Sequence, residues 1–139
     1  MRLHIVARGR IGRGPEADLV DTYLGRIRWP VRVREIGVAD PLPHVDPGTR
    51  TVALDERGHS LSSKSLAKLL GGWRDDGVRE TRFLLGAADG LGDEVRGEAD
   101  MLLSFGGATW PHLLARAMLA EQLFRATSII AGHPYHREG

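Results

Sequence analysis

The sequence has no cysteine among its 139 residues and no apolar run long enough to cross a membrane. The absence of cysteine excludes a disulfide framework, a thiolate metal site and a cysteine nucleophile. Arg8 and Arg10 interrupt the first residues too early for a signal peptide. These absences favour a cytoplasmic protein that has no membrane partner.

Several ligand-binding motifs are also missing. The sequence contains no P-loop, and its six histidines do not follow a metal-ligand spacing such as HExxH, so we expect no metal. Residues 9–14 space their glycines as GxxGxG, the reverse of the GxGxxG fingerprint of dinucleotide-binding proteins. An NAD(P)-binding Rossmann-type enzyme is therefore a disfavoured alternative.

Lysine is scarce, and arginine supplies most of the positive charge. Residues 1–34 contain eight arginines and only three carboxylates, although the net charge of the whole chain is +1. The planar fork of arginine suits phosphate oxygens, so a basic segment of this kind predicts a nucleic-acid partner. We expect Arg8, Arg10 and Arg13 to contact RNA. A non-enzymatic RNA-binding adaptor is an open alternative, because it would use the same arginines.

Short apolar strands alternate with helical patterns along the whole chain. The patterns predict strands over 2–7, 31–38, 51–55, 81–85 and 101–105, and helices that begin near Pro15, Ser62 or Ser63, Glu94 and Pro111. This alternation predicts a single α/β domain over residues 1–139, with a mostly parallel sheet and helices on both faces.

Three predicted strands end in turns that are suited to a ligand. These turns follow Leu54, Leu85 and Phe105, and the last two are rich in glycine. Ligands of parallel sheets bind at the carboxyl ends of the strands, and glycine lets the backbone approach them closely. We therefore predict a ligand site at this edge of the sheet.

The last quarter of the chain combines an apolar helix with a polar tail. The helix that begins near Pro111 has too many apolar positions to lie on a single face. We therefore expect a second subunit to bury the apolar side chains that the rest of the domain does not cover. Gly132 is a predicted helix cap, and the tail after it contains Tyr135, His136 and Arg137. Histidine is the side chain best suited to proton transfer near neutral pH.

Four groups of residues resemble the ribosomal RNA large subunit methyltransferase H family, which consists of small SPOUT-class enzymes. They are Leu54 and Asp55 with Gly58, Leu84 to Gly86 with Gly90 and Leu91, Thr109 with Pro111 and His112, and the tail from His133 to Glu138. The resemblance runs the full length of the chain. It implies a homodimer whose C-terminal segment is threaded into a trefoil knot.

The resemblance also implies a cofactor and a reaction. S-adenosylmethionine would be held by Leu54 and Asp55, by Gly86 and Ala87, and by the run Gly106, Gly107, Ala108, Thr109, Trp110 and Pro111. The methyl group would go to N3 of a pseudouridine in 23S ribosomal RNA on the ribosome. We expect His136 to be the base that removes the imino proton, with Tyr135 and Arg137 positioning it. Arg137 of the partner subunit would also contact RNA.

The second and third loops depart from the pattern usual in this family. The second reads GAADG over residues 86–90 where GGPEG is usual, so the Ala87 amide can face the cofactor only if the φ angle of Ala87 is negative. The third has Gly106 and Gly107 in place of bulkier residues, and Trp110 in place of an aliphatic one. These changes are expected to loosen the loop and reshape the adenine wall.

Overall fold

The computed structural model describes residues 1–137, so Glu138 of the predicted tail and Gly139 lie outside the described residues. Its elements in chain order are β1 (Arg2–Arg8), α1 (Pro15–Arg26), β2 (Val31–Ile36), β3 (Thr49–Ser60), α2 (Ser63–Asp75), β4 (Glu80–Leu85), α3 (Asp93–Glu98), β5 (Met101–Ser104) and α4 (His112–Ile130). Every strand and helix expected from the sequence is present, with shifted ends.

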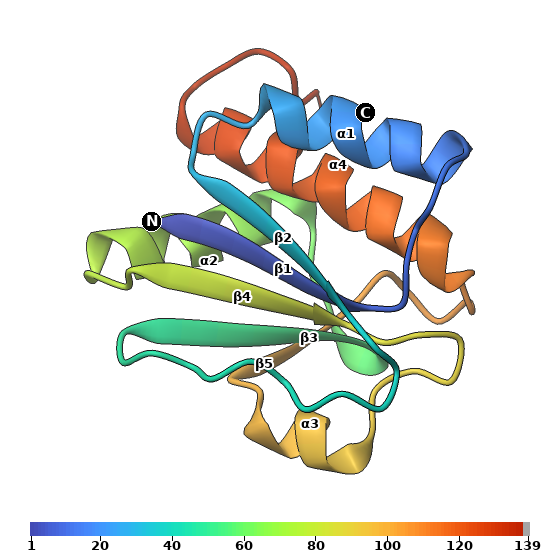
Figure 1. Cartoon of the computed structure of the whole chain (residues 1–139). Helices are drawn as coiled ribbons and strands as arrows, with labels where there is room; N and C mark the ends of the chain where they lie inside the picture. The colour runs from blue at the N-terminus through green and yellow to red at the C-terminus, as the bar shows by residue number, and fades with distance from the viewer. Residues whose placement is uncertain (138–139) are drawn as a thin grey trace.

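The five strands form one sheet in the order β2-β1-β4-β3-β5, and all four pairings are parallel. Helices α1, α2 and α4 cover one face of the sheet, and the short α3 lies on the other (Figure 1). The larger core lies under the three helices, where Phe83, Leu119 and Leu123 are fully buried. The predicted α/β class is confirmed.

Local signals explain where the helices begin and end. The side chain of Ser62 caps α2 by accepting a hydrogen bond from the Ser65 amide at 3.0 Å. At the end of α4, Gly132 has a φ angle of 74°, and the amide of His133 donates to the carbonyl of Ser128 at 2.9 Å. This is the Schellman arrangement that glycine favours, so the predicted cap is confirmed.

Strand β3 is twelve residues long and bends around β5. Leu54 and His59, on either side of the bend, are both register partners of Leu103. A Cβ added to Gly58 would lie 2.5 Å from the carbonyl carbon of Leu102, so only glycine fits where the two backbones approach each other this closely. The trefoil knot remains a prediction.

His4 is buried within a group of charged side chains on the sheet face opposite α1. It is 3% exposed, and its Nδ1 lies 3.4 Å from Nη2 of Arg32 and 3.8 Å from Glu80. Burial lowers the pKa of His4, and Arg32, Arg82 and Arg34 lower it further against the opposing effect of Glu80. The folded protein therefore holds His4 in its neutral form.

His4 should make the fold sensitive to mild acid. Because its pKa is lower in the folded than in the unfolded chain, stability is expected to fall as the pH drops below about 6.5, by at most about 1.4 kcal/mol per pH unit. Replacing His4 with glutamine should flatten the dependence of the unfolding free energy on pH between about 5 and 6.5. His59→Gln, which changes an exposed histidine, is the control, and equal slopes in the two variants would contradict this reading.

Candidate functional site

A cavity of about 580 Å³ lies beside the middle of β3 and at the carboxyl ends of β4 and β5. Eight of the ten residues predicted to bind the cofactor line it, namely Leu54, Asp55, Gly86, Ala87, Gly106, Ala108, Thr109 and Trp110. Gly107 and Pro111 belong to the same third loop but do not line the cavity. The predicted turns after β4 and β5 therefore meet at one site, whereas the turn predicted after Leu54 is wrong, because residues 55–60 continue β3 and Leu54 to Arg57 line the cavity from the middle of this strand.

The loop after β4 is a tight turn closed by its own backbone. The amide of Gly90 donates to the carbonyl of Ala87 at 2.8 Å, and a Cβ on Gly86 would lie 2.3 Å from the carbonyl carbon of Gly90. No non-glycine residue among 1–137 has a positive φ angle, so Ala87 does not. The replacement of the usual glycine by Ala87 is thus compatible with the backbone of this turn.

The loop after β5 presents bare backbone beside the cavity. The Ser104 hydroxyl donates to the carbonyl of Gly106 at 2.9 Å and accepts from its amide, which fixes the start of the loop. Gly106 has a φ angle of 105°, and added Cβ atoms on Gly106 and Gly107 would meet no atom within 4 Å. Trp110 is 43% exposed and lines the cavity, with its indole N–H donating to the Phe105 carbonyl at 3.3 Å.

A charged cluster forms the wall of the cavity next to α3. The side chain of Asp55 is only 7% exposed and accepts hydrogen bonds from the Arg57 amide at 2.8 Å and from Arg96 at 3.2 Å. Burial alone would raise the pKa of Asp55, but these bonds and the charges of Arg96 and Arg57 outweigh it, so the pKa is lowered. Asp55 is therefore ionised at neutral pH, and Arg96 also pairs with Asp93.

Sequence reasoning missed several residues that line the cavity. They are Glu56, Arg57, Ala88, Asp89, Arg96, Ser104 and Ala115, whereas the expected apolar walls Leu103 and Phe105 do line it. Most are chain neighbours of predicted residues, and could have been found by extending each turn. Arg96 could not, because only the packing of α3 against β3 brings it to Asp55.

The predicted catalytic tail packs against the middle of α4. The Tyr135 hydroxyl donates to Glu121 at 3.1 Å, and the Tyr135 ring lies between Phe124 and the guanidinium of Arg125, at 4.5 and 4.9 Å. Burial and the bond to Glu121 raise the pKa of Tyr135 to about 12. Tyr135 is therefore a neutral phenol at neutral pH, and its bond to Glu121 holds the tail against α4.

His136 is held by the same helix. Its Nδ1 lies 3.0 Å from Nη1 of Arg125. A guanidinium can only donate, so Nδ1 accepts, and the proton of the neutral imidazole is on Nε2. None of the residues 133–137 lines the cavity at the ends of β4 and β5 in its own chain. Glu121 lies nine residues along α4 from His112, which does line it, a rise of about 13 Å.

The three predicted RNA-binding arginines near the N-terminus have different surroundings. Nη1 of Arg8 donates to the carbonyls of Gly37, Val38 and Asp40, so this side chain fastens the loop after β2. Arg10 and Arg13 are exposed. RNA contact by all three remains a prediction, and the geometry favours Arg10 and Arg13.

The loop over residues 9–14 binds a carboxylate of the protein itself, that of Glu35. The amide of Ile11 donates to Glu35 at 2.8 Å, and the buried Arg116 pairs with Glu35 and donates to the carbonyl of Gly9. A pyrophosphate in a dinucleotide site needs the amides of such a loop for itself. The arrangement therefore argues against the NAD(P)-binding alternative.

Among residues 1–137 no group of three metal-ligating side chains could hold an ion. No helix in this part of the chain is long and apolar enough to span a bilayer.

The chain matches known proteins over its whole length. Residues 1–136 match the model of a family described as "Predicted SPOUT methyltransferase". A protein from Rhizorhabdus wittichii named "Ribosomal RNA large subunit methyltransferase H" is 68% identical over 140 residues, with 100% of both chains covered. Proteins of the same name from Novosphingobium aromaticivorans and Erythrobacter litoralis are 63% and 61% identical, also over 100% of both chains.

A solved structure shares the fold. It is described as a probable methylase family protein from Haemophilus influenzae Rd KW20, and it matches with a TM-score of 0.59 at 10% identity. The match covers 99% of this chain and 70% of that one. The chain therefore belongs to the SPOUT methyltransferase family and, within it, to the family of ribosomal RNA large subunit methyltransferase H.

Proposed function

We propose that this protein transfers a methyl group from S-adenosylmethionine to N3 of a pseudouridine in 23S ribosomal RNA on the ribosome. The observation that carries the proposal is the cavity beside β3 and at the ends of β4 and β5, where the middle of β3 and two loops bring together eight of the residues predicted to hold the cofactor. The names of the relatives support an action on large-subunit ribosomal RNA.

The residues of the cavity fit the cofactor. Its volume of about 580 Å³ lies within the usual range for small-molecule sites. Bare backbone at Gly106 can face a polar ligand, and Leu54, Leu103 and Phe105 supply apolar walls. When bound, S-adenosylmethionine supplies an electrophilic methyl group on a positively charged sulfonium. Apolar walls favour transfer, because this charge disappears as the methyl group moves to nitrogen.

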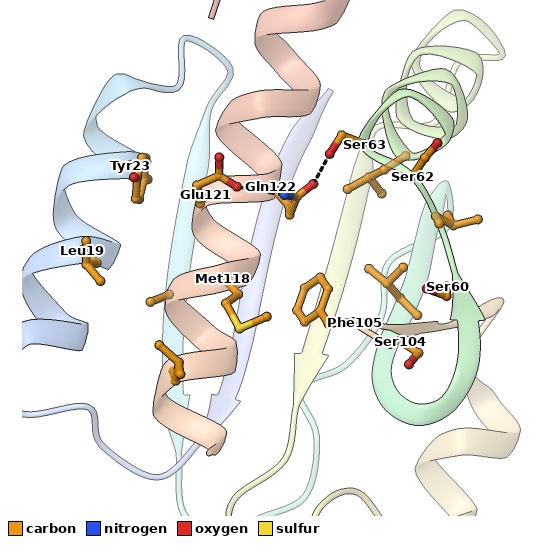
Figure 2. Close-up of a pocket in the computed structure, with 15 residues that line it drawn as sticks. Leu19, Tyr23, Ser60, Ser62, Ser63, Ser104, Phe105, Met118, Glu121 and Gln122 are labelled. Carbon is orange, nitrogen blue, oxygen red and sulfur yellow. Dashed lines mark hydrogen bonds between the residues drawn. The ribbon is translucent and has the colours of Figure 1, made fainter. Parts of the chain in front are cut away.

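The position of the tail supports a homodimer. Because His136 lies against α4 of its own chain, away from its own cofactor cavity, we propose that the tail of one subunit completes the cavity of the other. Helices α1 and α4 have exposed edges, which a second subunit would bury in a dimer. There Leu19 is 41% exposed, and it lines an open cavity of about 500 Å³ with Leu114 and Met118 (Figure 2).

The imino proton of the target base must leave as the methyl group arrives. We assign this step to His136, held by Tyr135 and Arg137. In the arrangement seen here Nδ1 of His136 is engaged by Arg125 and the proton is on Nε2. The assignment therefore requires the imidazole to exchange its bond to Arg125 for one to the substrate when the site closes.

Two measurements test the function. S-adenosylmethionine at about 100 times its Kd should raise the melting temperature by roughly 5–10 °C, and NAD should leave it unchanged. Labelled methyl groups should enter intact ribosomes and should fail to enter ribosomes that lack pseudouridine. Stabilisation by NAD alone would contradict the proposal. Binding to ribosomes with no response to S-adenosylmethionine would instead favour an RNA-binding adaptor.

A further inference from the structure

A second groove, of about 750 Å³, lies at the opposite end of α4 from its cofactor-binding end. It opens between the end of α1, the turn that follows it, the last turns of α4 and the tail, which lie side by side in Figure 1. Its lining includes Arg26, Arg28, Trp29, Phe124 and Tyr135. It shares no lining residue with the cofactor cavity.

The groove is lined by positively charged side chains and by no negatively charged ones. Two arginines line it, and none of its lining residues is a carboxylate. Neither Arg26 nor Arg28 pairs with a carboxylate among residues 1–137, whereas Arg96 and Arg116, deeper in the fold, both do. The two guanidinium groups at the groove are exposed and therefore available to an anionic ligand.

Aromatic surface lies beside these cations. Trp29, Phe124 and Tyr135 each contribute a half-buried ring to the lining. The guanidinium of Arg74 lies 5.6 Å from the centre of the Trp29 ring. Proteins bind unpaired bases by stacking them on aromatic rings while arginines hold the backbone, so the groove has both parts of a single-strand binding site.

We infer that this groove binds an unpaired nucleotide of the substrate RNA, with its base against Trp29 and its phosphate between Arg26 and Arg28. The inference rests on the proposed function for the identity of the RNA. Tyr135 lines the groove and directly precedes His136, the proposed base. A nucleotide bound here would therefore neighbour the target nucleotide and help to hold it in register.

The intrinsic fluorescence of Trp29 provides a direct test that needs no activity. Titration of the full-length protein with a uridine hexanucleotide should quench tryptophan emission, and the quenching should be lost in Trp29→Phe. The double variant Arg26→Ala with Arg28→Ala should bind the hexanucleotide at least about tenfold more weakly. Its salt dependence should also be shallower, by about 0.7 in the logarithmic slope for each lost phosphate contact.

Arg50→Ala is the matched control, because Arg50 is exposed and pairs with Asp100 away from the groove. Equal weakening in the control and the double variant, or no quenching that depends on Trp29, would overturn the inference.

Methyl transfer separates this inference from the proposed function. In the double variant the KM for ribosomes should rise about tenfold, while the affinity for S-adenosylmethionine stays unchanged. Suppose that no methyl transfer is found, but the hexanucleotide still binds through Trp29 and the two arginines. This result would support the inferred RNA-binding groove and would contradict the proposed reaction. If transfer is normal and the double variant keeps its KM, the groove has no part in recognition.

Discussion

Replacing His136 with alanine is expected to slow methyl transfer by about 10²–10⁴-fold, because a positioned base typically contributes that much. The rate should be measured in a single turnover with saturating S-adenosylmethionine and ribosomes, so that binding and product release do not enter. His44→Ala, which changes an exposed histidine in the loop between β2 and β3, should keep the wild-type rate. A wild-type rate in His136→Ala would contradict the assignment of His136 as the general base.

Mixing two inactive variants tests whether the tail acts on the partner subunit. Gly86→Val should block the cofactor cavity, because its Cβ would meet the carbonyl carbon of Gly90 at 2.3 Å, and this variant keeps His136. In a mixed dimer with His136→Ala, one of the two sites has both an intact cavity and an intact tail. Random exchange of subunits should therefore restore about one quarter of the wild-type activity. No recovery after verified exchange would mean that the tail acts on its own cavity.

Replacing Gly58 with alanine is expected to lower the unfolding free energy by about 3 kcal/mol, or the melting temperature by roughly 10 °C. The new Cβ would lie 2.5 to 2.8 Å from three backbone atoms of Leu102 and Leu103, and backbone cannot move aside as a flexible side chain can. Urea unfolding at one fixed protein concentration measures the effect, since dimerisation makes stability depend on concentration.

A second glycine provides the control for this experiment. Gly72 lies inside α2, and a Cβ there would meet no atom within 4 Å. Gly72→Ala should therefore stabilise the protein by up to about 1 kcal/mol, because alanine is the better helix former. If Gly58→Ala were as stable as the wild type, the close approach of the β3 and β5 backbones at Gly58 would not be a fixed part of the fold.

The position of the site could be predicted from the sequence because the signals for it are local. The apolar part of each strand ends abruptly in the sequence, at Asp55, at Gly86 and just before Gly106, although β3 itself continues to Ser60. Parallel strands bring their carboxyl ends to one edge, so predicting the strands was enough to predict that the turns meet. The cap of α4 at Gly132 was predictable for the same reason.

The features that sequence reasoning missed depend on tertiary contacts. The second half of β3 has the polar sequence Glu56, Arg57, Gly58, His59 and Ser60, and no alternation marks it as a strand. It becomes one because its end pairs with β5, some forty residues later. The length predicted for this strand, 51–55, was therefore too short.

The contacts of single side chains could not be predicted from the sequence either. The ion pair between Asp55 and Arg96 spans 41 residues, and the bonds from Arg8 to the loop after β2 span about 30. Charged residues of this kind are numerous in the sequence, and nothing local distinguishes those that pair from those that face water. Only the packing of α3 and of the loop over residues 37–40 selects them.

The strand order has a consequence for how the protein matures. Every neighbouring pair of strands is parallel and separated by a long connection, so no part of the sheet can assemble as a local hairpin. The cofactor cavity takes walls from β3, β4 and β5 and from the start of α4, so a nascent chain lacking its last thirty-odd residues has only part of the pocket. Only a chain that includes the start of α4 therefore has every wall of this cavity.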